Sequence, residues 1–167
     1  GEDNIFPHHE NEIAQSEAAT GKQFVKYWMH TRHVLLGGEK MSKSYKRLIY
    51  VRDAVKKYGA ANLRLYLLFT HYRKQLNFEE EGIKEATIHV ERIKKAVQFL
   101  IQSIQMDIKD KKENEEELIN QSQNYLNSFF EAMNDDLNIP LAIKFVIDFS
   151  KNVISFVESY GHISKDN

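Results

Sequence analysis

The sequence GIKEATIHVERIKKAVQFLIQSI, residues 82–104, decides the fold of the larger part of this chain. Its apolar residues recur in alternating steps of three and four positions, which places them along one side of an α-helix. Such a seam predicts a long amphipathic helix that packs against a neighbour. The seam consists of Ile83, Ala86, Val90, Ile93, Val97, Leu100 and Ile104.

Two further segments with the same kind of pattern follow this stretch. The charged residues 107–117 predict a connection, and Asn138-Ile139-Pro140 predicts a helix start because proline suits the first turn. We therefore expect three antiparallel helices that form a small bundle. The inward positions are expected to be Leu118, Tyr125, Leu126, Phe129, Phe130 and Met133 on the second helix, and Ala142, Phe145, Val146, Phe149, Val153, Phe156, Val157 and Tyr160 on the third.

The part of the chain before residue 79 has a mixed pattern. Pro7 and Gly21 bound a predicted helix over residues 8–19, and aromatic and β-branched residues predict one or two short strands within 24–36. Trp28 is expected in the core of such a strand. The remaining segments are expected to be a polar loop over 40–47 and helices over 51–58 and 60–70, the first of which ends at Gly59.

Composition limits the classes of protein to which the chain can belong. It has 167 residues, of which 42% are hydrophobic and 28% charged, and no cysteine, so it can form no disulfide. Residues 1–78 carry 13 Lys and Arg against 7 Asp and Glu, which suits a polyanionic partner, whereas the remainder carries 10 against 17. We find no signal peptide and no apolar run near the roughly 20 residues of a membrane span, so we expect a cytoplasmic protein without a membrane partner.

The first candidate site lies in Phe6-Pro7-His8-His9-Glu10-Asn11-Glu12. On a helix, His8 and Glu12 lie four positions apart and share one face, and an imidazole and a carboxylate so placed can bind one zinc ion. The alternative is a helix start with polar capping residues, and such pairs are common. The HExxH pattern of metallopeptidases is not met, because Ile13 stands four residues after His9.

The second candidate site is the string Lys40-Met41-Ser42-Lys43-Ser44, which follows a Gly37-Gly38 turn. Lysines neutralise charge that develops on a leaving pyrophosphate, and hydroxyls donate hydrogen bonds to phosphate oxygens. The alternative is a solvated basic loop. Asp3 follows a glycine and is a candidate acceptor for ribose hydroxyls, although most surface aspartates have no such role.

Taken together, these motifs resemble the class I aminoacyl-tRNA synthetases, and within them the cysteinyl-tRNA synthetases. The resemblance runs from Gly1 to about Ile147. It rests on the stretch from Phe6 to Ala18, on Tyr27-Trp28-Met29-His30, on the string from Lys40 to Ser44, on Leu63-Arg64 through His71-Tyr72-Arg73, and on Asn134-Asp135-Asp136-Leu137-Asn138.

The resemblance implies both a fold and its domains. The fold class is expected to be mostly α: a remnant of a class I Rossmann-like catalytic domain, with one or two short strands and helices, followed by an antiparallel helix bundle. The expected domains are residues 1–78, the C-terminal part of the catalytic domain with the zinc-ligand helix and the lysine loop, and residues 79–167, a truncated helical bundle.

The resemblance also implies an activity, the ATP-dependent attachment of cysteine to tRNA(Cys) through a cysteinyl-adenylate, with magnesium accompanying ATP. Lys43 would then be the main residue that stabilises pyrophosphate, and Lys40 its helper. Ser42, Ser44 and Asp3 would contact the nucleotide. His8 and Glu12 would be two of four zinc ligands, and the other two would be cysteines outside this chain. The zinc would select the cysteine thiolate over the serine hydroxyl, because it prefers a soft ligand.

Some features depart from the family pattern. Tyr45-Lys46-Arg47 stands where the family usually has Leu-Gly-Asn, and the family's His-x-Gly-His signature is absent, so we expect the isolated chain to be inactive.

Two alternatives stay open: a ligase that joins cysteine to a small amine, like the mycothiol-pathway ligases, and a non-catalytic tRNA-binding or protein-binding module. The remaining candidates are read as structural or surface residues, namely His9, His30, His33, His71, Arg64, Arg73 and Lys74.

Overall fold

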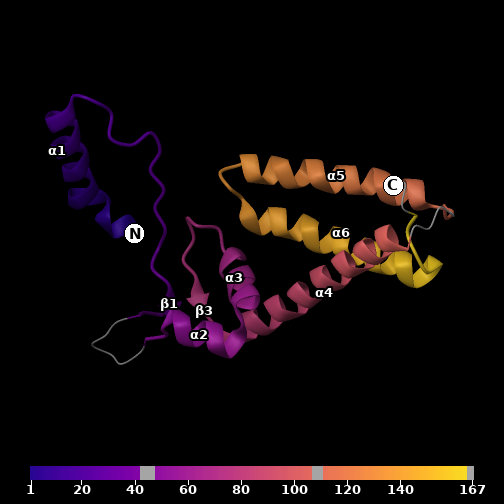
Figure 1. Ribbon diagram of the computed structural model, residues 1–167. Helices are drawn as coiled ribbons and strands as arrows, with labels where there is room; N and C mark the ends of the chain where they lie inside the picture. Colours follow the sequence, from indigo (N-terminus) through magenta and orange to yellow (C-terminus); the bar gives the residue numbers. More distant parts are fainter. Residues whose placement is uncertain (42–47, 107–110, 165–167) are drawn as a thin grey trace. The chain divides into compact units, whose positions relative to one another are not determined.

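The computed structural model describes residues 1–41, 48–106 and 111–164. The chain separates into two compact units, which we describe one at a time (Figure 1). Unit 1 consists of Gly1–Tyr50 and Tyr72–Glu79, and unit 2 of Val51–His71 and Glu80–Asn167. Residues 51–71 thus group with the helical bundle, because their helices contact α4, whereas the sequence pattern predicts them in the first domain. The domain boundary expected at residues 78 and 79 stays a prediction.

Unit 1 begins with a short helical region. A 3₁₀ turn over Glu2–Asn4 and a π-helical turn over Ile5–His9 lead into α1, Glu10–Thr20. Gly21 ends the helix in the left-handed conformation, with φ of 63°, and its N–H donates to the carbonyl of Glu17. The helix predicted over residues 8–19 is therefore confirmed.

The sheet of unit 1 is small. Strand β1, Leu35–Leu36, pairs antiparallel with β2, Glu39–Lys40, and parallel with β3, Asn77–Phe78. Gly37 and Gly38 have φ of 60° and 79°, so glycine permits the tight turn between β1 and β2. The prediction of strands within 24–36 is right for 35–36 and wrong for 24–34, where side chains stack locally. The loop predicted from Lys40 is also wrong at its first residue, because Lys40 belongs to β2.

Unit 2 begins with α2, Val51–Tyr58, and α3, Ala60–Leu68, which pack against the first part of α4, Glu80–Gln105. A side chain at Gly82 would displace the buried Tyr66 ring, because a Cβ there would lie 2.4 Å from its Cε2. The Nζ of Lys57 and the hydroxyl of Tyr58 both donate to Glu80 Oε1, at 2.6 and 2.7 Å. These contacts join the end of α2 to the start of α4.

The bundle is completed by α5, Glu115–Asn134, and α6, Ile139–Tyr160. Helix α6 packs against both α4 and α5, whereas the described residues of α4 and α5 share no extensive contact with each other (Figure 1). The core that joins all three helices contains Ala96, Leu118, Val153, Phe156 and Ile163. The mostly helical fold class with a helical bundle is confirmed.

The seam of α4 is correct in its first half and only partly correct in its second, where Leu100 packs against the core as predicted. Ile83, Ala86 and Val90 are buried as predicted, but Val97 is 46% and Ile104 60% exposed. Ala96 and Ser103 take the buried positions, one residue earlier. The first part of α4 packs against α3 and its later part against α6, so the buried side of the helix changes along its length. Two predicted inward residues of α5 are likewise largely exposed, Leu126 and Phe130.

Candidate nucleotide and metal site

The first candidate is the His8–Glu12 pair of unit 1. His8 lies in the π-helical turn and Glu12 in the first turn of α1, and two of the three residues between them, His9 and Glu10, have right-handed helical angles. The two side chains are therefore on the same face of the chain, as predicted. Both are exposed, and neither makes a hydrogen bond or ion pair with the described residues.

The pair supplies donors of the kind that zinc binds, an imidazole nitrogen and a carboxylate oxygen. Within the described residues no group of three or more His, Cys, Asp or Glu side chains is placed to bind a metal, and the chain has no cysteine. His8 and Glu12 thus fit half of a four-ligand set. The zinc site stays a prediction.

A stack of rings lies beside this pair. His9 Nδ1 and His30 Nε2 are 2.8 Å apart, and the Trp28 ring stacks on both imidazoles, with centroid distances of 5.0 Å to His9 and 5.8 Å to His30. Trp28 is 38% exposed and belongs to no strand, so the prediction of a strand core position is wrong. Because His9 follows His8 directly, the stack fixes the backbone that carries the candidate metal ligand. The contact joins segments 21 residues apart, and no periodicity in the sequence signals it.

Asp3 is tied to residues 31–33. The Glu2 N–H donates to the Thr31 carbonyl at 3.0 Å, and Asp3 Oδ1 lies 3.2 Å from His33 Nε2. Desolvation raises the pKa of the Asp3 carboxyl, but the hydrogen bond from its own backbone amide and the charge of His33 outweigh this, so its pKa lies below the usual value. Asp3 is therefore an ionised acceptor that keeps 49% of its side chain exposed.

Of the lysine string, the structure places Lys40 and Met41. Lys40 is exposed at the end of β2, opposite Leu35 of β1, and Met41 is half-buried. Ser42, Lys43 and Ser44 lie outside the described residues. The hairpin thus fixes where the string begins.

The candidates are distributed over two parts of unit 1. Asp3 and Lys40 are connected through the continuous segment 31–40, which contacts Asp3 at its start and carries the hairpin at its end. Helix α1 packs on the π-helical turn and, among the described elements, makes no extensive contact with the strands. The structure therefore does not bring the His8–Glu12 pair against Lys40.

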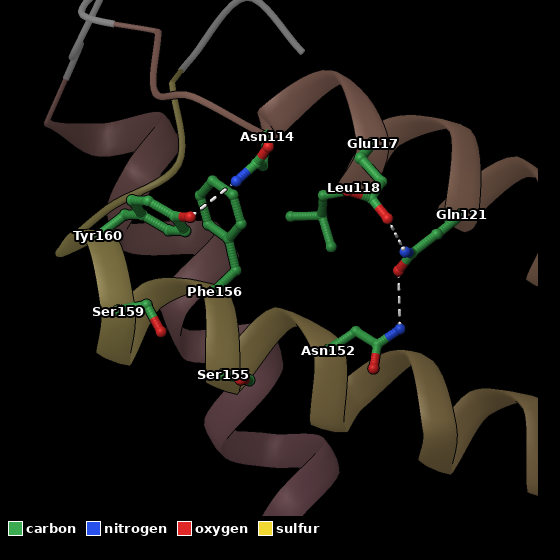
Figure 2. Close-up of a pocket in the computed structure, with 9 residues that line it drawn as sticks. All are labelled: Asn114, Glu117, Leu118, Gln121, Asn152, Ser155, Phe156, Ser159 and Tyr160. Carbon is green, nitrogen blue, oxygen red and sulfur yellow. Dashed lines mark hydrogen bonds between the residues drawn. The ribbon is translucent and has the colours of Figure 1, made fainter.

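Unit 2 has polar clusters that were not singled out from the sequence. A pocket of about 280 Å³ between α5 and α6 is lined by amides and hydroxyls (Figure 2). Asn114 Nδ2 donates to the Tyr160 hydroxyl at 2.8 Å, and Asn152 Nδ2 donates to Gln121 Oε1 at 2.9 Å. Because these groups satisfy one another, the pocket does not require a ligand.

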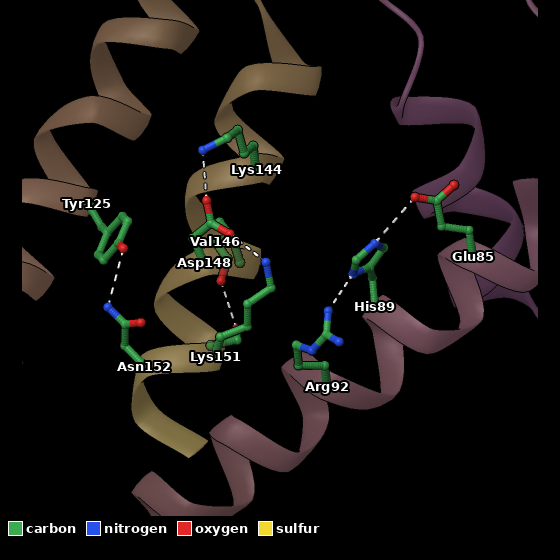
Figure 3. Close-up of polar contacts among 10 residues, drawn as sticks. Glu85, His89, Arg92, Tyr125, Lys144, Val146, Asp148, Lys151 and Asn152 are labelled. Atoms are coloured by element: carbon green, nitrogen blue, oxygen red, sulfur yellow. Dashed lines mark hydrogen bonds and ion pairs between the residues drawn. The ribbon is translucent and has the colours of Figure 1, made fainter. Parts of the chain in front are cut away.

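A second cluster consists of ion pairs on α4 and α6 (Figure 3). Asp148 accepts from Lys144 and from Lys151, each at 2.8 Å, and these hydrogen bonds hold the pKa of its carboxyl below the usual value. On α4, Arg92 and Glu85 both contact His89. Both carboxylates have cationic or imidazole partners, so we assign the cluster to stability.

No described helix is long and apolar enough to cross a membrane.

Comparison with known proteins agrees with these motifs. A cysteine–tRNA ligase from Thermodesulfovibrio yellowstonii is 42% identical over 167 residues, which cover 99% of this chain and 34% of that protein. Cysteine–tRNA ligases from Geotalea uraniireducens and Thermococcus onnurineus are each 41% identical, over 92% of this chain and 33% of theirs. The chain thus spans about one third of the length of the curated relatives that it matches.

A solved structure supports the fold alone. The ternary complex of LeuRS with tRNA and LeuAMS from Agrobacterium radiobacter matches with a TM-score of 0.76 at 20% identity, over 95% of this chain and 22% of that chain. The family model described as "tRNA synthetases class I (C) catalytic domain" matches residues 1–88, more than half of the chain. The chain therefore belongs to the family of class I (C) tRNA synthetases.

Proposed function

We propose that this chain is part of a cysteine–tRNA ligase, an enzyme that attaches cysteine to tRNA(Cys) at the expense of ATP. The observation that carries the proposal is the 42% identity to such a ligase over 99% of the chain. Because the chain spans about one third of its relatives, we propose that the 167 residues alone are inactive and that the longer protein carries the activity.

In the first step, a carboxylate oxygen of cysteine attacks the α-phosphorus of ATP. The bond from that phosphorus to the bridging oxygen breaks, and pyrophosphate leaves with its magnesium ion. Lys40 and Lys43 neutralise the negative charge that develops on the leaving group, and Ser42 and Ser44 donate hydrogen bonds to its oxygens. Asp3, which is ionised, accepts hydrogen bonds from the adenosine ribose.

In the second step, a hydroxyl of the terminal ribose of tRNA attacks the acyl carbon of the cysteinyl-adenylate. The acyl–phosphate bond breaks, the hydroxyl proton is released, and AMP leaves. The excess of basic residues in 1–78 supports a polyanionic partner for this part of the chain.

His8 and Glu12 would hold a zinc ion together with two cysteines from another part of the longer protein. When bound, zinc supplies an open coordination position for a thiolate, which serine cannot offer. The residues of this chain would position the ion. The stack of His9, Trp28 and His30 restrains the backbone next to His8, and α1 carries Glu12.

The first test is made on the longer protein, with cysteine-dependent exchange of pyrophosphate into ATP as the assay for adenylate formation. We expect Lys43→Ala to slow exchange by about 100-fold or more, since removal of one group that stabilises developing charge has effects of this order. Lys22→Ala, at an exposed lysine beyond α1, is the control and is expected to leave the rate unchanged. Equal rates for the two variants would contradict the role of Lys43.

The metal is tested separately. We expect Glu12→Gln to lower bound zinc and raise the KM for cysteine, whereas Glu10→Gln, an exposed carboxylate two positions earlier on the same helix, does neither. Full zinc content in Glu12→Gln would refute the ligand assignment. Charging of a small amine in place of tRNA would favour the alternative ligase, and tRNA binding without exchange would favour the non-catalytic alternative.

A further inference from the structure

The turn between α5 and α6 has an unfavourable backbone. Asp136 and Leu137 are consecutive non-glycine residues in the left-handed region, with φ of 50° and 55°. Each such residue costs about 1–2 kcal/mol relative to right-handed backbone, so the surroundings must hold the turn in place. Within the turn, the Asn138 N–H donates to the carbonyl of Ala132 at 3.0 Å, and the Ile139 N–H donates to that of Leu137 at 2.6 Å.

His71 contacts this turn from another part of unit 2. It follows α3, 65 positions earlier in the chain, and its Nε2 lies 3.0 Å from the main-chain oxygen of Asp136. Because a carbonyl can only accept, Nε2 carries the proton and donates. The same nitrogen is 4.0 Å from Asp136 Oδ2, and the His71 side chain is 17% exposed. Two motifs that the sequence analysis assigned to the family resemblance, around His71 and around Asp136, thus meet at one hydrogen bond.

The position of His71 in the chain gives this contact a further consequence. His71 is the last residue of unit 2 before the chain enters unit 1 at Tyr72. The following residues lead directly to β3, where the Leu35 N–H donates to the Leu76 carbonyl and β3 pairs with β1. Strand β1 in turn pairs with β2, which ends at Lys40. A continuous path of covalent bonds and backbone hydrogen bonds therefore runs from His71 to the start of the lysine string.

We infer that His71 is a positioning residue, whose hydrogen bond to Asp136 holds the α5–α6 turn and fixes the end of the segment that leads through β3 and β1 to Lys40. The inference rests on the proposed function, in which Lys40 assists adenylate formation. His71 itself touches no reacting atom. It acts by restricting the backbone on which the lysine string depends, and a displacement of a catalytic group by about 1 Å costs up to 100-fold in rate.

The test uses the longer protein and compares three variants. His71→Phe keeps a ring and removes the donor, and we expect kcat for pyrophosphate exchange to fall about tenfold with an unchanged KM for cysteine. His71→Gln restores an N–H donor, and we expect its kcat to return to within about twofold of the original. His89→Phe is the matched control, because His89 belongs to the same unit and its side chain is 19% exposed. It is expected to leave kcat unchanged.

A strain-relief variant separates positioning from general destabilisation. In the double variant His71→Phe with Asp136→Gly, glycine adopts the left-handed conformation without strain but the hydrogen bond from residue 71 is still absent, so we expect the melting temperature to recover and kcat to stay about tenfold low. The inference is overturned if His71→Phe keeps its rate, if His71→Gln is as slow as His71→Phe, or if His89→Phe is equally slow. It is also overturned if the double variant regains both its melting temperature and its kcat, because the low rate of His71→Phe would then come from destabilisation alone.

The outcome can be distinguished from failure of the proposed function. If the unsubstituted protein shows no cysteine-dependent exchange, the proposed function fails. In that case amide hydrogen exchange at Asn138 and Ile139 still tests the contact, and we expect exchange about tenfold faster in His71→Phe than in His89→Phe. Equal protection in the two variants would show that His71 does not hold the turn.

Discussion

The two units differ in what holds them together. Among the described residues of unit 1, Phe78 is buried, and the others are half-buried or exposed. Unit 1 is held together by stacked rings, by a sheet of three two-residue strands and by polar contacts such as Asp3–His33. Unit 2 instead has a continuous apolar core along α4 and α6. The unit that carries every candidate site residue is thus the one with little core of its own, and we expect most of the stability of the chain to come from unit 2.

The largest predicted effect compares one phenylalanine from each unit. Phe156 is 8% exposed in the bundle core, whereas Phe24 is 46% exposed beside Trp28. We expect Phe156→Ala to lower the free energy of unfolding by about 3–5 kcal/mol, and Phe24→Ala by less than about 1 kcal/mol. Urea unfolding of the 167-residue chain measures both. A loss of similar size in the two variants would mean that unit 1 has a core of comparable strength.

The next effect concerns a buried carboxylate. Glu115 has no exposed surface, and its two oxygens accept the N–H groups of Lys112 and Ser164. In Glu115→Gln an NH₂ group replaces one acceptor and faces an N–H donor, so we expect a loss of about 2 kcal/mol. Glu116→Gln, at an exposed position beside it, is expected to change stability by less than about 0.5 kcal/mol. Equal stability of the two variants would show that the carboxylate charge is not required.

Close packing of α3 against α4 gives an effect of similar or smaller size. The Cβ of Gly82→Ala would lie 2.4 Å from the Tyr66 ring, and we expect this variant to cost about 1–3 kcal/mol. In the double variant with Tyr66→Leu, the clash disappears, so the two losses should be less than additive. Additive losses in thermal unfolding would show that the cost of Gly82→Ala does not come from the Tyr66 ring.

The smallest effect is a dependence on pH. The pKa of the Asp148 carboxyl is lowered mainly by the hydrogen bond from Lys144 and to a smaller extent by the one from Lys151. The folded state is therefore stabilised by the ionised carboxylate above the usual pKa of 3.8, and this contribution is lost as the pH falls through the lower pKa of the folded state. Solvent screens the pair, so we expect less than about 1 kcal/mol. Asp148→Asn should flatten the acid limb of the stability curve. An unchanged acid limb would show that the pairs contribute nothing.

Sequence periodicity predicted the helices because it reports which side of a helix is apolar. It misplaced Val97 and Ile104 because the 26-residue helix packs first against α3 and then against α6, and a single seam does not describe two partners. The propensity that predicted strands within 24–34 was overridden, since the Trp28 ring stacks on His9 and His30 instead of joining a sheet.

For the candidate site, the spacing of residues along the chain predicted their arrangement only where those residues lie within a few positions of one another. His8 and Glu12 share a face because they are four positions apart on helical backbone. The links of His9 to His30 and of His71 to Asp136 bridge 21 and 65 positions and have no local signal. Lys43 lies outside the described residues, so its role stays a prediction.

The shared position of α6 has a consequence for how the protein is made. Helices α4 and α5 meet mainly through α6, which is the last of the three to be synthesised. The first part of α4 can pack against α3, but its later part and α5 cannot bury their apolar sides while α6 is still inside the ribosome, and at about 5–20 residues per second that delay lasts for seconds. We therefore expect the nascent bundle to remain open to chaperones until translation has passed Tyr160, when all three helices can close in one cooperative event.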